Sequence, residues 1–131
     1  MEQPSAAMLV IGDELLSGRT HDANMHYLAK ELTEIGISLT EARFIRDDPA
    51  AIVSNIIELS KRFDYLFTSG GIGPTHDDIT TDCVAEAFEK KASIRSDALK
   101  ILQEYYDGKD IELNEARLRM ARIPETAELI D

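Results

Sequence analysis

Phosphate binding is indicated first by residues 68–80, which read TSGGIGPTHDDIT. Three glycines in this segment allow backbone angles closed to other residues and let a ligand approach the main chain closely: Gly70, Gly71 and Gly73. Three further side chains offer hydroxyl donors to phosphate oxygens: Ser69, Thr75 and Thr80. The same residues would also suit a plain tight turn. Their place after an expected buried strand and before an expected helix favours a phosphate-binding loop.

Two carboxylates, Asp77 and Asp78, follow the glycines directly. Bare carboxylates repel phosphate, so their presence calls for a bridging cation. A Mg²⁺ ion held by carboxylate and phosphate oxygens would supply one, which predicts Asp77 and Asp78 as metal ligands. The alternative is that both are solvated or that one of them caps the following helix, and for Asp77 we favour that alternative.

A second polar segment, GDELLSGRTHDAN at residues 12–24, also follows an expected strand. Because the carboxyl ends of parallel strands meet at one edge of a sheet, we expect it beside the glycine loop. Two acids in it are candidate catalytic residues, Asp13 and Glu14, and Ser17 and Arg19 are candidate ligand-binding residues. Arg19 would pair with a phosphate or a carboxylate. Asp47 and Asp48 follow the next expected strand and would lie at the same edge of the sheet. For Asp48, capping of the following helix is a sufficient explanation.

The elements that position these segments alternate between strand and helix. Apolar runs predict buried strands over 6–12 and 65–68, and a more polar strand over 37–46. Helical spacing predicts a helix over 24–36, with Met25, Leu28, Leu32 and Ile35 on its apolar face. Four further helices are expected to begin at capping or first-turn residues: at Asp48-Pro49, at Thr80 or Thr81, at Ser96 and at Asn114. The alternation is typical of a parallel sheet with helices on its faces, and 94–124 reads as helical and peripheral.

Bulk properties limit the function classes. A net charge of −11 argues against nucleic-acid binding, and no apolar run approaches the roughly 18–20 residues needed to span a membrane. The start lacks a secretory signal, and the one cysteine, Cys83, fits a reducing compartment and small buried packing. These observations predict a single cytoplasmic domain over residues 1–131.

Four ordered segments carry a family resemblance. They are VIGDELLSG (10–18), N-x3-L-A-x2-L-x3-G (24–36), TSGGIGPTHDDITTD (68–82) and RMARIPETAELI (119–130). With them the chain resembles the molybdopterin-binding domain family of molybdenum-cofactor biosynthesis. It is most similar to the branch found at the N-terminus of competence/damage-inducible proteins and as stand-alone relatives.

The resemblance implies a three-layer α/β/α sandwich with a mostly parallel central sheet, and often a trimer. In cofactor-synthesising members the domain binds molybdopterin and uses Mg-ATP to adenylylate its phosphate. The acids important there map onto Asp13 or Glu14 and onto Asp78. The first loop here reads Gly-Asp-Glu-Leu-Leu instead of the S-D-x-x-S pattern of dedicated enzymes. The family also continues with a P-G-V-P-containing segment, so we expect the domain to be truncated at its C-terminus.

Three functions stay open at this point. The first is a molybdopterin- or nucleotide-binding domain linked to molybdenum-cofactor biosynthesis, with the ligand at the SGGIGP loop. The second is a divalent-metal-dependent pyrophosphatase acting on ADP-ribose or FAD-like dinucleotides, which would use the acids of both loops. The third is a non-enzymatic oligomerising module that uses segment 94–106. A glycine loop indicates phosphate but does not separate pterin from adenine, or Mg²⁺ from another metal.

Overall fold

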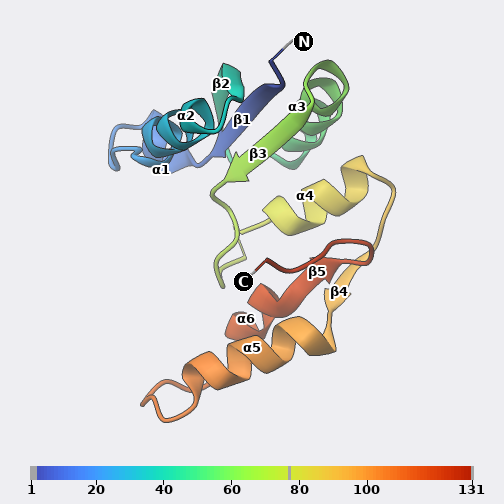
Figure 1. The fold of residues 1–131 in the computed structure, drawn as a ribbon. Helices are drawn as coiled ribbons and strands as arrows, with labels where there is room; N and C mark the ends of the chain where they lie inside the picture. The colour runs from blue at the N-terminus through green and yellow to red at the C-terminus, as the bar shows by residue number, and fades with distance from the viewer. Residues whose placement is uncertain (1–2, 77, 131) are drawn as a thin grey trace. The chain divides into compact units, whose positions relative to one another are not determined.

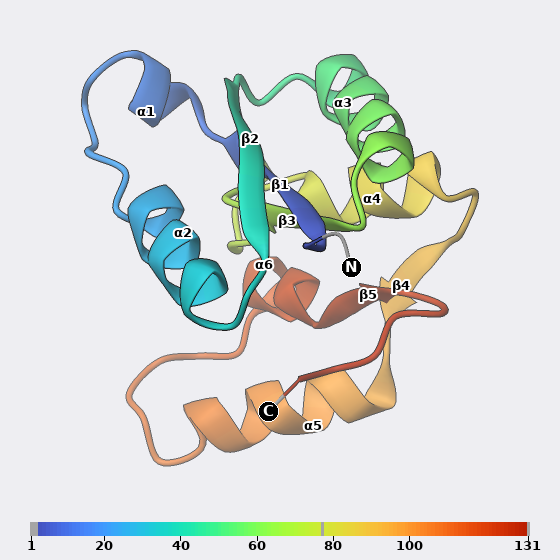
Figure 2. The ribbon, with the colours of Figure 1, turned by 45° about the horizontal axis from the view of Figure 1, so that its top comes forward.

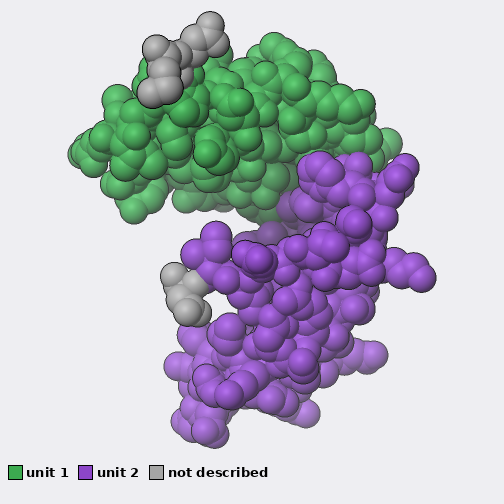
Figure 3. Space-filling model, turned by 45° about the vertical axis from the view of Figure 1, so that its right-hand side comes forward, with its two compact units in different colours: residues 1–70 green, residues 71–131 purple. Residues whose placement is uncertain are grey.

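The computed structural model describes residues 3–76 and 78–130, so the predicted metal ligand Asp77 lies outside the described residues. The chain divides into two compact units, Met1–Gly70 and Gly71–Asp131, which Figure 3 distinguishes by colour. The division falls inside the glycine loop, so that Ser69 and Gly70 belong to the first unit and the rest of the loop to the second.

The first unit is built on a three-stranded parallel sheet in the order β2-β1-β3 (Figure 1). Its strands are β1 (Ser5–Ile11), β2 (Ser38–Ile45) and β3 (Tyr65–Ser69). From Ala6 to Ile11 every residue of the central strand β1 is buried, as its continuous apolar run predicts. In register, Met8 lies opposite Ala42 on one side and Phe67 on the other. The parallel sheet confirms the predicted fold class.

The helices of the first unit complete an α/β/α arrangement. They are α1 (Asp13–Leu16), α2 (Asn24–Glu34) and α3 (Pro49–Arg62). Figure 2 shows α2 and α3 on opposite sides of the sheet. From β1 the chain moves to β2 on one side of it, and from β2 it moves back past β1 to β3 on the other side. Because parallel strands are joined by right-handed crossovers, two connections in opposite directions place α2 and α3 on opposite faces of the sheet. On α3, Ile52, Ile56 and Leu59 are buried at helical spacing.

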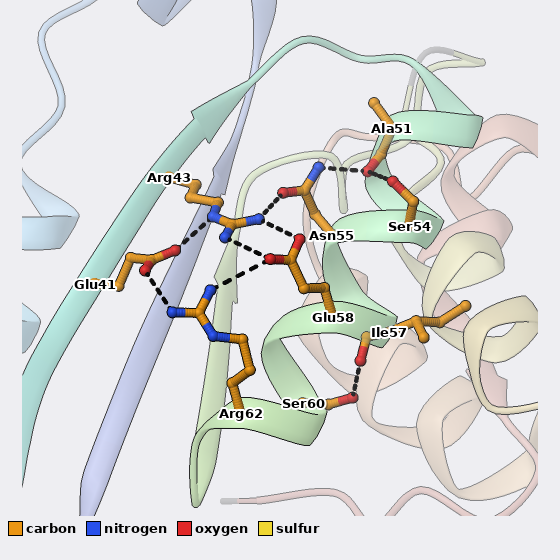
Figure 4. Close-up of polar contacts among 9 residues, drawn as sticks. All are labelled: Glu41, Arg43, Ala51, Ser54, Asn55, Ile57, Glu58, Ser60 and Arg62. Atoms are coloured by element: carbon orange, nitrogen blue, oxygen red, sulfur yellow. Dashed lines mark hydrogen bonds and ion pairs between the residues drawn. The ribbon is translucent and has the colours of Figure 1, made fainter.

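A network of charged side chains ties the edge strand β2 to α3 (Figure 4). Arg43 donates from Nε to Glu41 (2.6 Å) and from Nη1 to Glu58 (2.8 Å) and Asn55 (2.8 Å). Arg62 binds both Glu41 and Glu58 from the other side. Hydrogen bonding to Glu58, then to Glu41, raises the pKa of Arg43, and bonding to Arg43 lowers the pKa of Glu58 to about 2. The network adds side-chain contacts between α3 and the polar strand β2, which pairs with β1 through its backbone.

In its described residues, the second unit contains three helices, one 3₁₀ turn and a two-stranded antiparallel sheet. Its elements are α4 (Thr80–Ala87), β4 (Ala92–Ile94), α5 (Ser96–Tyr106), α6 (Glu115–Leu118), η1 (Arg119–Ala121) and β5 (Arg122–Pro124). The prediction that the chain is helical as far as Pro124 was therefore wrong, because α6 ends at Leu118 and β5 pairs with β4. Cys83 on α4 is buried, as predicted.

The helix starts confirm some predicted caps and correct others. Asn114 accepts a hydrogen bond from the Arg117 amide (2.9 Å), as a capping residue should. Asp48 holds the N-cap position of α3 in an extended conformation but makes no side-chain cap bond. Thr80 and Ser96 were wrongly predicted as caps: each is the first helical residue, following the N-cap residues Ile79 and Arg95. Among the described residues no helix has the length and apolar character needed to cross a bilayer.

Candidate functional site

The carboxyl ends of β1 and β2 carry an acidic cleft of about 590 Å³ in the first unit. Asp13 and Asp47 are hydrogen-bonded to each other there: each carboxylate accepts a hydrogen bond from the other residue's backbone amide (both 3.1 Å). Arg46 lies beside this pair, with its Nε 3.5 Å from the Asp13 carboxylate. Asp48 lines the same cleft. The structure thus confirms that Asp47 and Asp48 join the rim formed by Asp13.

The other predicted residues of segment 12–24 contact their own neighbours in the sequence. The Glu14 carboxylate lies over Gly12, where a Cβ atom on Gly12 would meet Oε1 at 2.7 Å. Arg19 is exposed and donates from Nε to the Ser17 hydroxyl (3.1 Å). Within the described residues, neither Ser17 nor Arg19 bonds to the glycine loop. Their assignment as ligand-binding residues stays a prediction.

The glycine loop begins where β3 ends beside β1, the pair of strand ends at which sheets of this order bind ligands. Ser69 accepts a hydrogen bond from the Asn24 side-chain amide (2.8 Å), which links the loop to the start of α2. Gly70 has φ +94°, and a Cβ atom there would lie 2.0 Å from the carbonyl oxygen of Ile11. Only glycine therefore lets the chain pass this close to the end of β1.

The second half of the loop closes on the start of α4. Gly71 accepts a hydrogen bond from the Thr80 amide (3.0 Å) and has φ +68°. A Cβ atom on Gly71 would lie 2.2 Å from the Thr80 hydroxyl oxygen, and Thr80 is 2% exposed. Two successive backbone amides, those of Gly71 and Ile72, have no hydrogen-bond partner within residues 3–76 and 78–130. The Ile72 side chain is exposed.

Asp78 organises the middle of the loop. Its carboxylate accepts hydrogen bonds from the Thr75 hydroxyl (2.7 Å) and the Thr75 amide (2.9 Å), and also from the Gly73 amide. Burial acts to raise the pKa of Asp78, but these hydrogen bonds and the nearby charge of Arg119 outweigh it, so the pKa lies below its ordinary value. Asp78 is therefore an anion at neutral pH whose charge is already neutralised in part by the loop.

The acids predicted to act together belong to different units, Asp13 and Glu14 to the first and Asp78 to the second. Within the part of the chain that the structure describes, no three His, Cys, Asp or Glu side chains form a group that could hold a metal ion. Mg²⁺ accepts one or two protein carboxylates when phosphates and water complete its shell.

Arginines on the C-terminal segment were missed by the sequence reasoning. In the second unit a cleft of about 660 Å³ lies between the loop residues Pro74–His76 and the segment 114–119, where Arg117 and Arg119 border it. Arg119 also borders a smaller hollow beside Ile72, Gly73 and Asp78. The available signal was three arginines within six residues, at 117, 119 and 122, in a strongly acidic chain.

Residues 7–123 match a family model described as "Probable molybdopterin binding domain". A CinA-like protein of Kosmotoga olearia is 36% identical over 126 residues, covering 96% of this chain and 31% of its own. A protein of Metallosphaera sedula is 40% identical over 127 residues and 96% of this chain. A Caenorhabditis elegans protein named probable FAD synthase is 45% identical over 87 residues, covering 66% of this chain and 17% of its own. The chain spans about half the length of the first archaeal relatives it matches.

Two solved structures show the same fold. The protein CinA of Thermoplasma acidophilum, described as having unknown function, is 29% identical with a TM-score of 0.87. The match covers 98% of this chain and 75% of that one. The tungsten cofactor synthesizing protein MoaB of Pyrococcus furiosus is 20% identical with a TM-score of 0.61, over 83% of this chain and 66% of that one. At that identity the second match establishes the fold alone.

Proposed function

This chain belongs to the molybdopterin-binding domain family, and from that premise we propose that it binds a phosphate-containing ligand, a molybdopterin or an adenine nucleotide, at the glycine loop. The observation that carries the proposal is the pair of unpartnered amides of Gly71 and Ile72 among the described residues. Backbone N–H groups left free beside glycines form concave anion sites. They would receive phosphate oxygens in a chain whose net charge of −11 otherwise repels anions.

Two loop geometries support this placement. Gly70 and Gly71 both have positive φ and both lack room for a Cβ atom, so the path of the backbone is set by contacts and not by chance flexibility. The Asp78 carboxylate then holds Thr75 and Gly73, which keeps the free amides in one arrangement before a ligand arrives. Preorganisation of this kind lowers the entropy lost on binding.

The proposal is tested by incubating the protein with Mg²⁺ and, separately, with ADP-ribose, FAD, or ATP plus molybdopterin, followed by mass spectrometry of the small molecules. Adenylylated pterin would assign the protein to cofactor synthesis. Retention of a pterin or nucleotide without conversion would support a binding role. The proposal is wrong if the protein binds none of these molecules in equilibrium dialysis.

A second candidate is a divalent-metal-dependent pyrophosphatase acting on ADP-ribose or FAD-like dinucleotides. The nematode relative named probable FAD synthase favours it, since FAD contains a phosphoanhydride. In this reaction water attacks one phosphorus, the bridging P–O bond breaks, AMP leaves, and a carboxylate takes the proton from water. Asp13 and Glu14 stay predicted catalytic acids of the first unit. In the second unit Asp78, with its lowered pKa, suits a metal ligand better than a general acid. Release of AMP from a dinucleotide would establish this activity.

The third candidate, an oligomerising module, rests on exposed apolar side chains of β4 and α5: Ile94, Ile101 and Tyr105. Large apolar side chains gathered on one exposed segment are typical of association surfaces. The family resemblance favours a trimer. Light scattering at two protein concentrations tests it, and a strict monomer at both would contradict it. We also place the protein in the cytoplasm, which fractionation of cells would test.

A further inference from the structure

Asn24, the first residue of α2, makes a contact that the start of a helix does not require. An Asn at such a place ordinarily caps the helix by accepting from its free amides. Here Asp22 does so instead, because its carboxylate accepts from the amides of Asn24 (3.3 Å) and Met25 (3.0 Å). The side chain of Asn24 is therefore available for another contact, and its Nδ2 donates to the hydroxyl oxygen of Ser69 (2.8 Å).

This bond fixes the direction in which the Ser69 hydroxyl donates. A serine hydroxyl has one proton and two lone pairs, whereas the amide nitrogen of Asn has two protons and accepts nothing. The oxygen of Ser69 therefore uses a lone pair on Asn24, and its own proton must point elsewhere. Within residues 3–76 and 78–130 no protein atom accepts that proton. The first residue of the glycine loop thus offers a donor to a ligand.

The backbone around Ser69 is already restrained by the sheet. Ser69 is the last residue of β3 and lies opposite Val10 in the register with β1. The next residue, Gly70, passes so close to the Ile11 carbonyl oxygen that a Cβ atom would lie 2.0 Å from it. What stays free at Ser69 is rotation about the Cα–Cβ and Cβ–Oγ bonds. The hydrogen bond from Asn24 restricts both rotations.

We propose that Asn24 is a positioning residue of the glycine loop, which holds the Ser69 hydroxyl as a hydrogen-bond donor to the bound anion. The proposal rests on the proposed phosphate site at the loop and adds a residue of α2 to it. An oxygen that carries no proton is the partner that such a donor fits, as in a phosphate group. Asn24 itself does not contact the ligand in this arrangement.

Asn24→Asp reverses the direction of this hydrogen bond with almost no change of shape. A carboxylate only accepts, so the Ser69 hydroxyl would turn to donate to it and would lose its proton for the ligand. A carboxylate in the first turn of a helix is favourable, so the variant should fold. If the bond served only to hold α2 to β3, Asp would serve as well as Asn, and anion binding would be unaffected.

The test titrates inorganic phosphate at pH 7 and fixed ionic strength, and follows the backbone amide signals of Gly71 and Ile72 by NMR. Dissociation constants are measured for wild type, Asn24→Asp, Asn24→Ala, Ser69→Ala and the double variant Asn24→Asp/Ser69→Ala. Ala23→Asp is the matched charge control, because Ala23 is the exposed N-cap residue beside Asn24.

We expect Asn24→Asp and Ser69→Ala each to weaken phosphate binding at least about tenfold, since each removes a hydrogen bond to a charged group. Asn24→Ala leaves the hydroxyl free to turn and weakens binding about threefold, and Ala23→Asp weakens it less than about twofold. The double variant binds within about threefold of Ser69→Ala, because both substitutions remove the same donor.

Other outcomes separate this proposal from the loop site. If Asn24→Asp binds phosphate within about twofold of wild type, or if the losses in the double variant are additive, the role of Asn24 is wrong while the loop site stands. If phosphate shifts neither amide signal of the wild type, the loop site is wrong and the role of Asn24 with it. Thermal unfolding checks that each variant is folded. Should Asn24→Asp not fold, Asn24→Ala decides, because an affinity equal to that of wild type contradicts the proposal.

Discussion

Substituting Asp78 by Asn tests whether this carboxylate holds the glycine loop together. Its Oδ2 atom accepts from the Thr75 hydroxyl at 2.7 Å and from the Thr75 amide at 2.9 Å. A hydrogen bond to a charged group contributes about 1.5–3 kcal/mol, against about 1 kcal/mol for a neutral one. Asn keeps an acceptor but loses the charge, so each bond weakens by about 0.5–2 kcal/mol. Because Asp78 is partly exposed, we take the lower end and expect about 1 kcal/mol in total.

Urea and thermal unfolding measure the loss, with Thr75→Val as the partner variant. A change of about 1 kcal/mol corresponds to roughly 3–5 °C for a chain of this length. Thr75→Val removes the hydroxyl bond alone and also costs about 1 kcal/mol. Since the two side chains share that bond, the double variant should lose less than the sum of the single losses. Unchanged melting in both single variants, or strict additivity, would refute the loop clamp.

Three further predictions come from other contacts. Gly70→Ala should cost at least about 3 kcal/mol, because φ is +94° and the new Cβ would lie 2.0 Å from Ile11 O. Gly108→Ala, at φ +75° with open space around it, should cost only about 1 kcal/mol in the same urea titration. Asn114→Ala should lose about 1 kcal/mol by removing the cap on α6, and Asn114→Ser should recover most of it. The pKa of Glu58 is lowered to about 2, so its stabilising contribution is complete above pH 4.5 and is lost as the pH falls from about 4.5 to about 2. Glu58→Gln should therefore have a smaller drop in urea midpoint between pH 6 and pH 3, and an equal drop would contradict the network.

The first unit was predictable because its signals are local and strong. The apolar run of β1 admits only a strand buried at the centre of a sheet, and the structure buries it. On α3, Pro49 after Asp48 and three apolar residues at helical spacing give both the start and the buried face. The cap itself was not predictable in detail, since an Asp at the N-cap position bonds its side chain only when the rotamer and the neighbouring backbone allow it.

The second unit was harder because its decisive contacts are remote. β4 and β5 have three residues each and lie about thirty positions apart, so neither shows the alternation that marks a strand. Arg122 binds Asp82 on α4 (2.6 Å) and the Ala92 carbonyl oxygen (3.2 Å), which fixes β5 where a continued helix was expected. Such a contact depends on three segments at once. The placement of Arg119 beside the loop escaped prediction for the same reason.

The contacts of Asp78 weaken the reason for expecting a metal ion. The sequence predicts Mg²⁺ because bare carboxylates repel phosphate, but three loop donors already surround the Asp78 carboxylate. In the proposed site, the neutral amides of Gly71 and Ile72 would receive an anion without a cation. We therefore expect phosphate binding to persist in EDTA with less than a threefold loss, while any phosphoanhydride cleavage stops, because the leaving group needs charge stabilisation that Mg²⁺ supplies. Calorimetry of phosphate binding with EDTA and with Mg²⁺ measures the first effect. A loss of more than tenfold on chelation would show that the ion holds the phosphate and that the loop amides do not suffice.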